Sequence, residues 1–298
     1  MKTGAKLIVL HPSLHKQGIP AVPSSSHRIL ALVFAAFFGF GFALSLFSGK
    51  HAVPGALTLA AAEAARPQLP QPAIDALLYY ATLNTSSVGS RMSSPEVSAV
   101  VASLRRCGYA CNFLVFGLTH ETLLWNSLNH NGRTVIVDES AYAVSKLEEK
   151  NPGIEAYDVQ FTTRVSEFRN LLKHADEEAK RDCRPVQNLL FSDCKLAIND
   201  LPNHLYDVAW DVILVDGPRG YSQSAPGRMS AIFTAGVLAR SKRGGAAQTQ
   251  VFVHEIDREV ERVSSERFLC RGNLVNSVGK LGHYAVGKFE AKENRFCS

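Results

Sequence analysis

The stretch that decides the fold is residues 112–128, NFLVFGLTHETLLWNSL. It begins with an apolar run that stops at a glycine, and it continues with helical spacing over residues 119–128. The two parts predict a buried strand, a tight turn and a helix. A second apolar run at residues 134–137 and a second helical pattern at residues 141–149 follow directly. Strand and helix repeated in this order predict a parallel βαβα unit.

The same alternation continues through the C-terminal part of the chain. Residues 210–215, WDVILV, form the clearest later strand and stop at the turn sequence Asp-Gly-Pro. We also expect strands at residues 154–161, 251–254, 266–269 and 283–288, helices at residues 94–104, 165–180 and 228–238, and a further apolar run at residues 186–191. Strands that alternate with helices imply a mostly parallel sheet with helices on both faces. The predicted fold class is therefore α/β, with a Rossmann-like sheet.

A separate apolar segment, residues 29–47, precedes this domain. Its sequence, ILALVFAAFFGFGFALSLF, carries no charge, and as a helix it would extend about 28 Å, close to the hydrocarbon thickness of a bilayer. A cleaved signal peptide is the alternative, although its apolar core is usually shorter. We predict one transmembrane signal anchor, followed by a stem rich in Ala and Pro at residues 48–72 and a globular domain at residues 73–298.

Positive charge is concentrated before this apolar segment. Residues 1–28 contain four Lys or Arg and no acid, so the remaining 270 residues keep only +1 of the net charge of +5. The positive-inside rule then places residues 1–28 in the cytosol and the C-terminal domain in a lumen, as a single-pass type II protein. A short span rich in Phe favours the Golgi or the endoplasmic reticulum. We expect no nucleic-acid partner, because the domain has no basic excess.

The number and spacing of the cysteines bear on compartment and metal binding. An even count in an oxidising lumen predicts disulfides, but six cysteines allow 15 pairings and the sequence selects none of them. The spacing also lacks the His and Cys pattern of a zinc site, so we predict no metal. The six residues are Cys107, Cys111, Cys183, Cys194, Cys270 and Cys297.

Two predicted strand ends carry residues suited to a nucleoside-type cofactor, because ligands of open α/β sheets bind beyond the carboxyl ends of the strands. Gly117 allows a tight turn and a close approach of the backbone to a ligand. Asp138 follows it by 21 residues, the offset at which an acid accepts hydrogen bonds from a ribose, and Glu139 is the neighbouring candidate. The alternatives are an ordinary turn at the glycine and a solvated helix cap at the acids.

Later strand ends provide candidates for catalysis. Asp216 ends the most hydrophobic strand, where it can hold or deprotonate an acceptor hydroxyl; a turn-forming Asp before Gly-Pro is the alternative. His254 also follows an apolar strand and can exchange a proton near neutral pH, unless it is a structural histidine. Asp193, after the apolar run at residues 186–191, is a candidate for contact with an adenine edge.

Two arginines near Asp216 are candidates for substrate binding. Arg219 and Arg228 can pair with a carboxylate such as that of a sugar acid, since a guanidinium binds carboxylates in a bidentate manner. A surface salt bridge is the alternative for each. The sequence does not choose between these interpretations.

Four long segments together resemble a plant polysaccharide-biosynthesis family that contains the glucuronoxylan 4-O-methyltransferases and the irregular xylem fifteen proteins. The resemblance covers about residues 73–298 and implies an S-adenosylmethionine-methyltransferase-like fold. It also implies a Golgi type II membrane protein that is required for xylan in plant secondary cell walls. The segments are FLVFGLTHETLLW at 113–125, NSLNHNGRT at 126–134, WDVILVDGPRG at 210–220 and PGRMSAIFTA at 226–235.

The details of these segments resemble the irregular xylem fifteen branch, and they leave two functions open. The methyltransferase branch implies transfer of a methyl group from S-adenosylmethionine to the 4-hydroxyl of glucuronic acid side chains of xylan. The alternative is a non-catalytic accessory or scaffold protein that binds other Golgi xylan-synthesis proteins. For this branch the resemblance does not secure catalytic activity. The loop also departs from the glycine-rich turn common in methyltransferases, since Leu118, Thr119 and His120 stand where further glycines would bring a cofactor closer.

Overall fold

The computed structural model describes residues 69–83, 91–107, 110–289 and 293–297. The chain divides into two units, residues 1–63 and 64–298, and every described residue belongs to the second unit. The predicted cytosolic tail, the predicted membrane span and nearly all of the predicted stem lie outside the described residues. No helix among the residues that the structure describes combines the length and the apolar character needed to cross a membrane.

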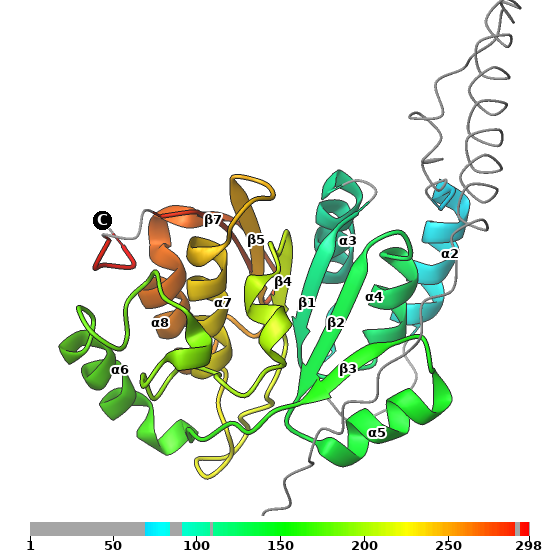
Figure 1. Ribbon diagram of the computed structural model, residues 1–298. Coiled ribbons are helices and arrows are strands. Elements are labelled where there is room, and N and C mark those ends of the chain that lie inside the picture. Colours follow the sequence, from blue (N-terminus) through cyan, green and yellow to red (C-terminus); the bar gives the residue numbers. More distant parts are fainter. Residues whose placement is uncertain (1–68, 84–90, 108–109, 290–292, 298) are drawn as a thin grey trace, which may run out of the picture. The chain divides into compact units, whose positions relative to one another are not determined.

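A seven-stranded sheet with the order β3-β2-β1-β4-β5-β7-β6 forms the centre of the second unit (Figure 1). The first five strands in this order are parallel, and β7 runs antiparallel to both β5 and β6. The mostly parallel sheet predicted from the sequence is thus confirmed. The strands are β1 (Asn112–Phe116), β2 (Arg133–Asp138), β3 (Glu155–Asp158), β4 (Val212–Val215), β5 (Gln248–Val253), β6 (Leu274–Val278) and β7 (Leu281–Gly287).

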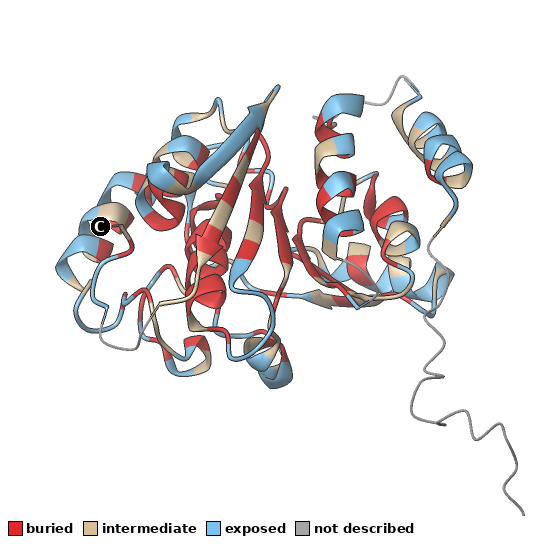
Figure 2. Cartoon of the chain, turned by 90° about the horizontal axis from the view of Figure 1, so that it is seen from above, coloured by how far each residue is buried: buried red, intermediate tan, exposed pale blue. Residues whose placement is uncertain are grey.

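Helices cover both faces of this sheet because alternate strand residues point to opposite faces. Phe113 and Val115 pack in the core beneath α2 (Gln71–Thr82), α3 (Ser94–Cys107), α4 (Thr122–Leu128) and α5 (Ala141–Lys150). Leu114 and Phe116 pack on the other face with α6 (Phe168–Glu177), α7 (Met229–Ser241) and α8 (Glu259–Ser265). Figure 2 shows the buried strands between helices whose outer surfaces are exposed. The predicted domain start at residue 73 falls inside α2.

Short helical turns replace two features predicted as extended. Residues 266–269 were expected to form a strand but belong to a π-helix, Glu266–Cys270, in which Phe268 packs on Phe233 of α7. The apolar run at residues 186–191 contains a 3₁₀ turn, Leu189–Phe191, rather than a strand. Short apolar runs do not distinguish a strand from a buried helical turn. The remaining 3₁₀ turns are η1 (Val165–Glu167), η3 (Asn203–Asp207) and η5 (Arg271–Asn273).

The six cysteines form three disulfides, each between neighbours in the sequence order. Cys107–Cys111 joins the end of α3 to the start of β1, Cys183–Cys194 closes a loop between α6 and β4, and Cys270–Cys297 ties the C-terminal segment to the π-helix. This selects one of the 15 pairings that the sequence left open. Such bonds are typical of an oxidising compartment.

Candidate active site

A cavity of about 560 Å³ opens at the carboxyl ends of the parallel strands. It lies where the strand order reverses, between β1 and β4, which is the position of ligand crevices in open α/β sheets. Residues that follow β1, β2 and β4 line this carboxyl-edge pocket. They are Gly117, Leu118, Thr119, His120 and Glu121 after β1, Asp138 at the end of β2 with Glu139, Ser140 and Ala143 after it, and Asp216, Gly217, Arg219 and Arg228 after β4. Arg91, before α3, also lines the pocket.

Gly117 is required by the crossing of two loops at the base of this pocket. Its φ of +110° suits glycine, and a Cβ placed on it would lie 2.6 Å from the backbone nitrogen of Gly217. The backbone of the loop after β4 therefore takes the space that a side chain at Gly117 would fill. The predicted tight turn is present, and the close approach that the glycine permits is to Gly217.

Asp138 holds the loop after β1 in place. Its Oδ2 accepts a hydrogen bond of 2.6 Å from the backbone N–H of Leu118, and its Oδ1 accepts one of 2.9 Å from Ser140. Asp138 is buried, with 8% of its surface exposed. Each carboxylate oxygen has two lone pairs, so these bonds leave Asp138 the capacity to accept from a ribose hydroxyl.

Glu139 is the more exposed acid of this pair and also lines the pocket. Partial desolvation raises the pKa of Glu139, and the neighbouring carboxylate of Asp138 adds to this effect, while Arg219 opposes it. Because Glu139 follows β2 and lines the pocket, it offers a second carboxyl group where a nucleoside would lie in such a sheet. The structure brings Gly117, Asp138 and Glu139 together, as the sequence predicted.

Asp216 and His254 form a buried pair behind the pocket. Asp216 Oδ1 lies 2.8 Å from His254 Nδ1, with 6% and 1% of the two residues exposed. Burial lowers the pKa of His254, but the hydrogen bond and the charge of Asp216 outweigh it, so the pKa is raised overall. Asp216 lines the pocket whereas His254 does not. The geometry makes Asp216 the group that can meet a substrate and His254 the group that orients it.

Arg228 is a positioning residue in this structure rather than a free clamp for a substrate. It is 2% exposed, and each of its three guanidinium nitrogens donates to a protein acceptor. The backbone oxygens of Pro218, His254 and Asp216 accept at 3.1, 2.7 and 3.0 Å. The same group also lies 3.4 Å from Asp216 Oδ1 and 3.0 Å from Glu255 Oε2. Of the two arginines predicted to bind a sugar carboxylate, Arg219 thus remains the candidate.

Arg219 is exposed at the rim of the pocket, and Arg258 holds the loop that carries it. Arg258 donates to the backbone oxygens of Arg219 and Gly220, both at 2.8 Å, and pairs with Glu255 at 2.7 Å. Glu255 has a φ of +59°, which is uncommon for a residue with a side chain. Arg228 and Arg258 thus stabilise the backbone on which Asp216 and Arg219 are placed.

Two charged residues that line this pocket, Glu121 and Arg91, were not predicted as site residues, and two predicted residues, His254 and Asp193, do not line it. Glu121, at the start of α4, is 3% exposed, and Arg91 enters from a segment before the sheet. Glu121 follows the first strand end closely enough to have been considered, but nothing in the sequence links Arg91 to the site. Asp193 is exposed, follows the turn at residues 189–191 and does not line the pocket.

The pocket residues fit an adenosine-type cofactor on an observation independent of the sequence motif. The hydroxyl oxygen of Thr119 is buried and has no hydrogen-bond partner in the described part of the chain, as expected for a group that a ligand completes. The cavity volume also lies within the range of small-molecule sites, roughly 300–1,000 Å³. Asp138, Glu139 and Thr119 are the residues that would hold such a group.

One group of side chains in the described ranges brings possible metal-ligand atoms close together. Within the described ranges, the ligand-type atoms that gather closely are those of Cys107, Cys111 and Asp211. The two sulfurs are joined in a disulfide, so they do not supply the thiolates that zinc binds. This group lies outside the carboxyl-edge pocket.

A family model for IRX15/IRX15L/GXM matches residues 95–284. The chain belongs to this family. It is similar to Protein IRREGULAR XYLEM 15 of Arabidopsis thaliana, with 49% identity over 99% of this chain and 94% of that protein. Protein IRX15-LIKE of Arabidopsis thaliana is 50% identical over 99% of this chain and 94% of its own length. The family resemblance inferred from the four sequence segments is confirmed.

Other members of the IRX15/IRX15L/GXM family carry an enzyme name. Glucuronoxylan 4-O-methyltransferase 3 of Arabidopsis thaliana is 40% identical over 77% of this chain and 75% of that protein. Among solved structures, a methyltransferase-like protein from Silicibacter pomeroyi is similar in structure, with 14% identity and a TM-score of 0.39. The match includes 67% of this chain and 89% of that protein's chain. The carboxyl-edge pocket lies within the matched family region, apart from Arg91.

Proposed function

We propose that this protein serves xylan biosynthesis through a domain of S-adenosylmethionine-methyltransferase type, which methylates O-4 of glucuronic acid side chains of glucuronoxylan. The observation that carries this proposal is the pocket at the strand switch point, where Asp216 faces the same cavity as Asp138 and Glu139. A cofactor-binding strand end and a group for proton transfer therefore share one site. The name of the 40% identical relative agrees with this chemistry.

Different residues of the pocket would bind the cofactor, accept the proton and bind the substrate carboxylate in such a transfer. S-adenosylmethionine, when bound, supplies an electrophilic methyl group. Asp138 and Glu139 would accept hydrogen bonds from its ribose. Asp216 would orient the sugar 4-hydroxyl and accept its proton as the methyl group passes from sulfur to that oxygen, with S-adenosylhomocysteine as the leaving group. His254 and Arg228 hold Asp216 through Oδ1, which leaves Oδ2 for the hydroxyl. Arg219 binds the uronate carboxylate, because a guanidinium pairs well with a carboxylate.

The proposed setting is the lumenal side of the Golgi membrane in cells that form secondary walls. A type II anchor at residues 29–47 agrees with the charge of residues 1–28. Three disulfides in the described domain agree with an oxidising lumen. Other Golgi xylan-synthesis proteins and the glucuronoxylan chain itself are the proposed partners.

A non-catalytic accessory role is the second candidate, and one observation favours it. The chain is 49–50% identical to the two IRREGULAR XYLEM 15-type relatives but 35–40% identical to the three glucuronoxylan methyltransferases. Leu118, Thr119 and His120 also fill the turn in which glycines would allow a cofactor closer to the backbone. In this case the pocket would be retained for partner or polysaccharide binding.

Titration of the full-length chain in detergent with S-adenosylmethionine separates the two candidates. The enzyme proposal expects saturable heat of binding, and it expects Asp216→Asn to keep this binding while methyl transfer to a glucuronoxylan oligosaccharide falls at least about 100-fold. Asp182→Asn, on an exposed loop outside the pocket, is the matched control and should transfer normally. No binding by a folded sample would remove the enzyme proposal. Failure to capture any xylan-synthesis protein from Golgi membranes would count against the accessory role.

A further inference from the structure

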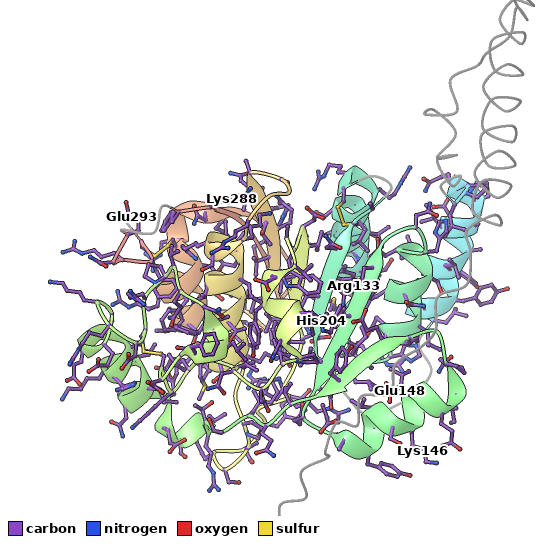
Figure 3. All side chains as sticks on the ribbon, viewed as in Figure 1. Arg133, Lys146, Glu148, His204, Lys288 and Glu293 are labelled. Atoms are coloured by element: carbon purple, nitrogen blue, oxygen red, sulfur yellow. A yellow bond between two sulfur atoms is a disulfide. The ribbon has the colours of Figure 1, made fainter. Side chains whose placement is uncertain are left out.

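A second cavity of about 480 Å³ lies at the opposite edge of the sheet, where β4 and β5 begin. It is formed by the C-terminal end of α7, the loop after α6, the η3 turn before β4 and the end of β7. Figure 3 shows Lys288 at this edge. We name it the basic pocket after the cations that line it, which are Arg184, Arg240, Lys242, Arg243 and Lys288.

The cations of the basic pocket lack a matching set of acids. Asp207 is the one acid that lines it among the described residues, and Asp211 acts on Lys242 from nearby. Arg184 and Arg243 are exposed, and neither makes a side-chain ion pair with another described residue. Lys288 donates to backbone oxygens of the loop before β5 and not to a carboxylate. The pocket therefore carries an excess of positive charge.

Arg240, in the floor of this pocket, is a buried cation without an acidic partner in the described part of the chain. It is 1% exposed, and its guanidinium donates at 2.9 Å to the backbone oxygens of Phe268 and Phe296. No described carboxylate lies within 4.0 Å of it, and its Nε has no hydrogen-bond partner among the described residues. Burial lowers its pKa to about 10. A buried charge normally has a counter-ion, and an anion in the pocket would supply one.

The end of α7 explains only part of this charge. Cations are favoured at helix C-termini, and Arg240, Lys242 and Arg243 follow that rule. Arg184 and Lys288 come from two other segments, 104 residues apart in the sequence, and helix capping does not account for their position. Lys288 also repels Lys242 and helps to lower its pKa, after burial as the main cause and against Asp211. Convergence of like charges from separate segments costs stability unless a ligand offsets it.

We propose that the basic pocket is an anion-binding site that takes the uronate carboxylates of an acidic polysaccharide. Arg184 and Arg243 are the exposed guanidinium groups that can form bidentate pairs with a carboxylate. Tyr206 and Phe289 line the same cavity and offer ring surface to the C–H faces of a sugar. The choice of a uronate over another anion rests on the proposed function, whereas the anion site itself rests on the charges. The basic pocket would bind one part of the polysaccharide while a glucuronic acid side group farther along the same polysaccharide is methylated in the carboxyl-edge pocket.

The test measures oligosaccharide binding in a background that weakens the carboxyl-edge pocket. The full-length chain in detergent carries Arg219→Gln throughout, so that binding by the basic pocket is isolated. The probes are a glucuronoxylan oligosaccharide, a neutral xylo-oligosaccharide of equal length and inorganic phosphate. The test variant adds R184Q, R243Q and K288Q, and the matched control adds K146Q, K173Q and R271Q, three exposed cations elsewhere on the domain (Figure 3 labels Lys146).

We expect the glucuronoxylan oligosaccharide to bind, the neutral one not to bind, and the test variant to lose at least about tenfold in affinity, because charge-assisted contacts are removed. The control variant should bind as its parent does, and thermal unfolding should show both variants folded. Equal binding by test variant and parent, or no binding by the parent, overturns the proposal. Competition by phosphate at equal affinity overturns the uronate assignment. Methyl transfer to a short acceptor, measured without Arg219→Gln, reports separately on the proposed function.

Discussion

The two pockets at opposite edges of the sheet differ in how their charged residues are held. At the carboxyl edge, Asp216, Arg228 and His254 are each buried and joined by hydrogen bonds. In the basic pocket, at the opposite edge, Arg184 and Arg243 are exposed and form no ion pair among the described residues. A group that must meet one reacting atom needs a fixed position, whereas a site that attracts a charged polymer needs only a favourable potential. We therefore expect substitutions in the carboxyl-edge pocket to lower the stability of the domain strongly and substitutions in the basic pocket to change it little.

Loss of Arg228 should have the largest effect, because it would leave both backbone and carboxylate acceptors without a partner. We expect Arg228→Met to lower the free energy of unfolding by about 3–5 kcal/mol, as for one partner of a buried ion pair. Chemical denaturation of the full-length chain in a mild detergent measures it. Arg271→Met is the matched control: Arg271 is exposed in its pair with the half-buried Glu266, and we expect a change below about 1 kcal/mol. Equal effects of the two changes would show that the carboxyl-edge network does not stabilise the domain.

Substitution of Gly117 tests the crossing of the two loops beneath the carboxyl-edge pocket. We expect Gly117→Ala to cost about 1–3 kcal/mol, because the new Cβ would meet the Gly217 backbone in a conformation that disfavours side chains. Gly153→Ala is the matched control, since a Cβ there meets nothing within 4 Å. Thermal unfolding of both variants measures the difference. A stable Gly117→Ala protein with unchanged cofactor binding would show that the crossing is not required.

These effects could be predicted from the sequence only in part. The central parallel strands β1, β2 and β4 can be recognised because each contains a continuous apolar run that stops at a glycine or an acid, and parallel strands bring those ends to one edge. Gly117, Asp138 and Asp216 therefore meet in the structure as expected. The edge strand β6 was missed because its residues are mostly exposed, so it lacks an apolar signal.

The roles of single side chains were harder to predict than the strands. Arg228 was expected to bind substrate, but its role depends on three carbonyl groups that only the folded chain brings around it. Asp193 was assigned to a strand end, and the apolar run before it forms a helical turn instead. The basic pocket was not predicted, because Arg184 and Lys288 are far apart in the sequence and carry no motif.

A change of pH should affect the carboxyl-edge pocket and leave the basic pocket unaffected. The pKa of His254 is raised above 6.5 in the folded protein, so its contribution to stability is fully present below about pH 6.5 and is lost as pH rises through the folded value. We therefore expect the free energy of unfolding to fall as the pH is raised from 6 to 8. The Arg and Lys residues of the basic pocket stay charged in this range.

Denaturant unfolding between pH 6 and 8 tests the effect of His254, and His254→Asn should flatten the profile. The pKa of His283 is lowered to about 4 by burial and by Arg106. Its contribution has the opposite sign, since it is lost as pH falls below about 6.5, so it does not obscure the change at higher pH. An unchanged slope in His254→Asn would place the pH dependence elsewhere. Oligosaccharide binding at the basic pocket should stay constant over the same interval.

The smallest effect on stability is expected at the basic pocket itself. Arg243 is exposed and lies among other cations, so Arg243→Gln should change the free energy of unfolding by less than about 0.5 kcal/mol. Relief of repulsion favours a small gain over a loss. Lys146→Gln, which breaks an exposed pair with Glu149, is the control for removal of a surface cation. Thermal unfolding compares the two variants at low salt, where charges are screened least and act most strongly.

A loss above about 1 kcal/mol in Arg243→Gln would exceed what an exposed side chain contributes. Such a loss would show that Arg243 stabilises the fold. The carboxyl-edge pocket and the basic pocket would then not differ in how their charged residues are held.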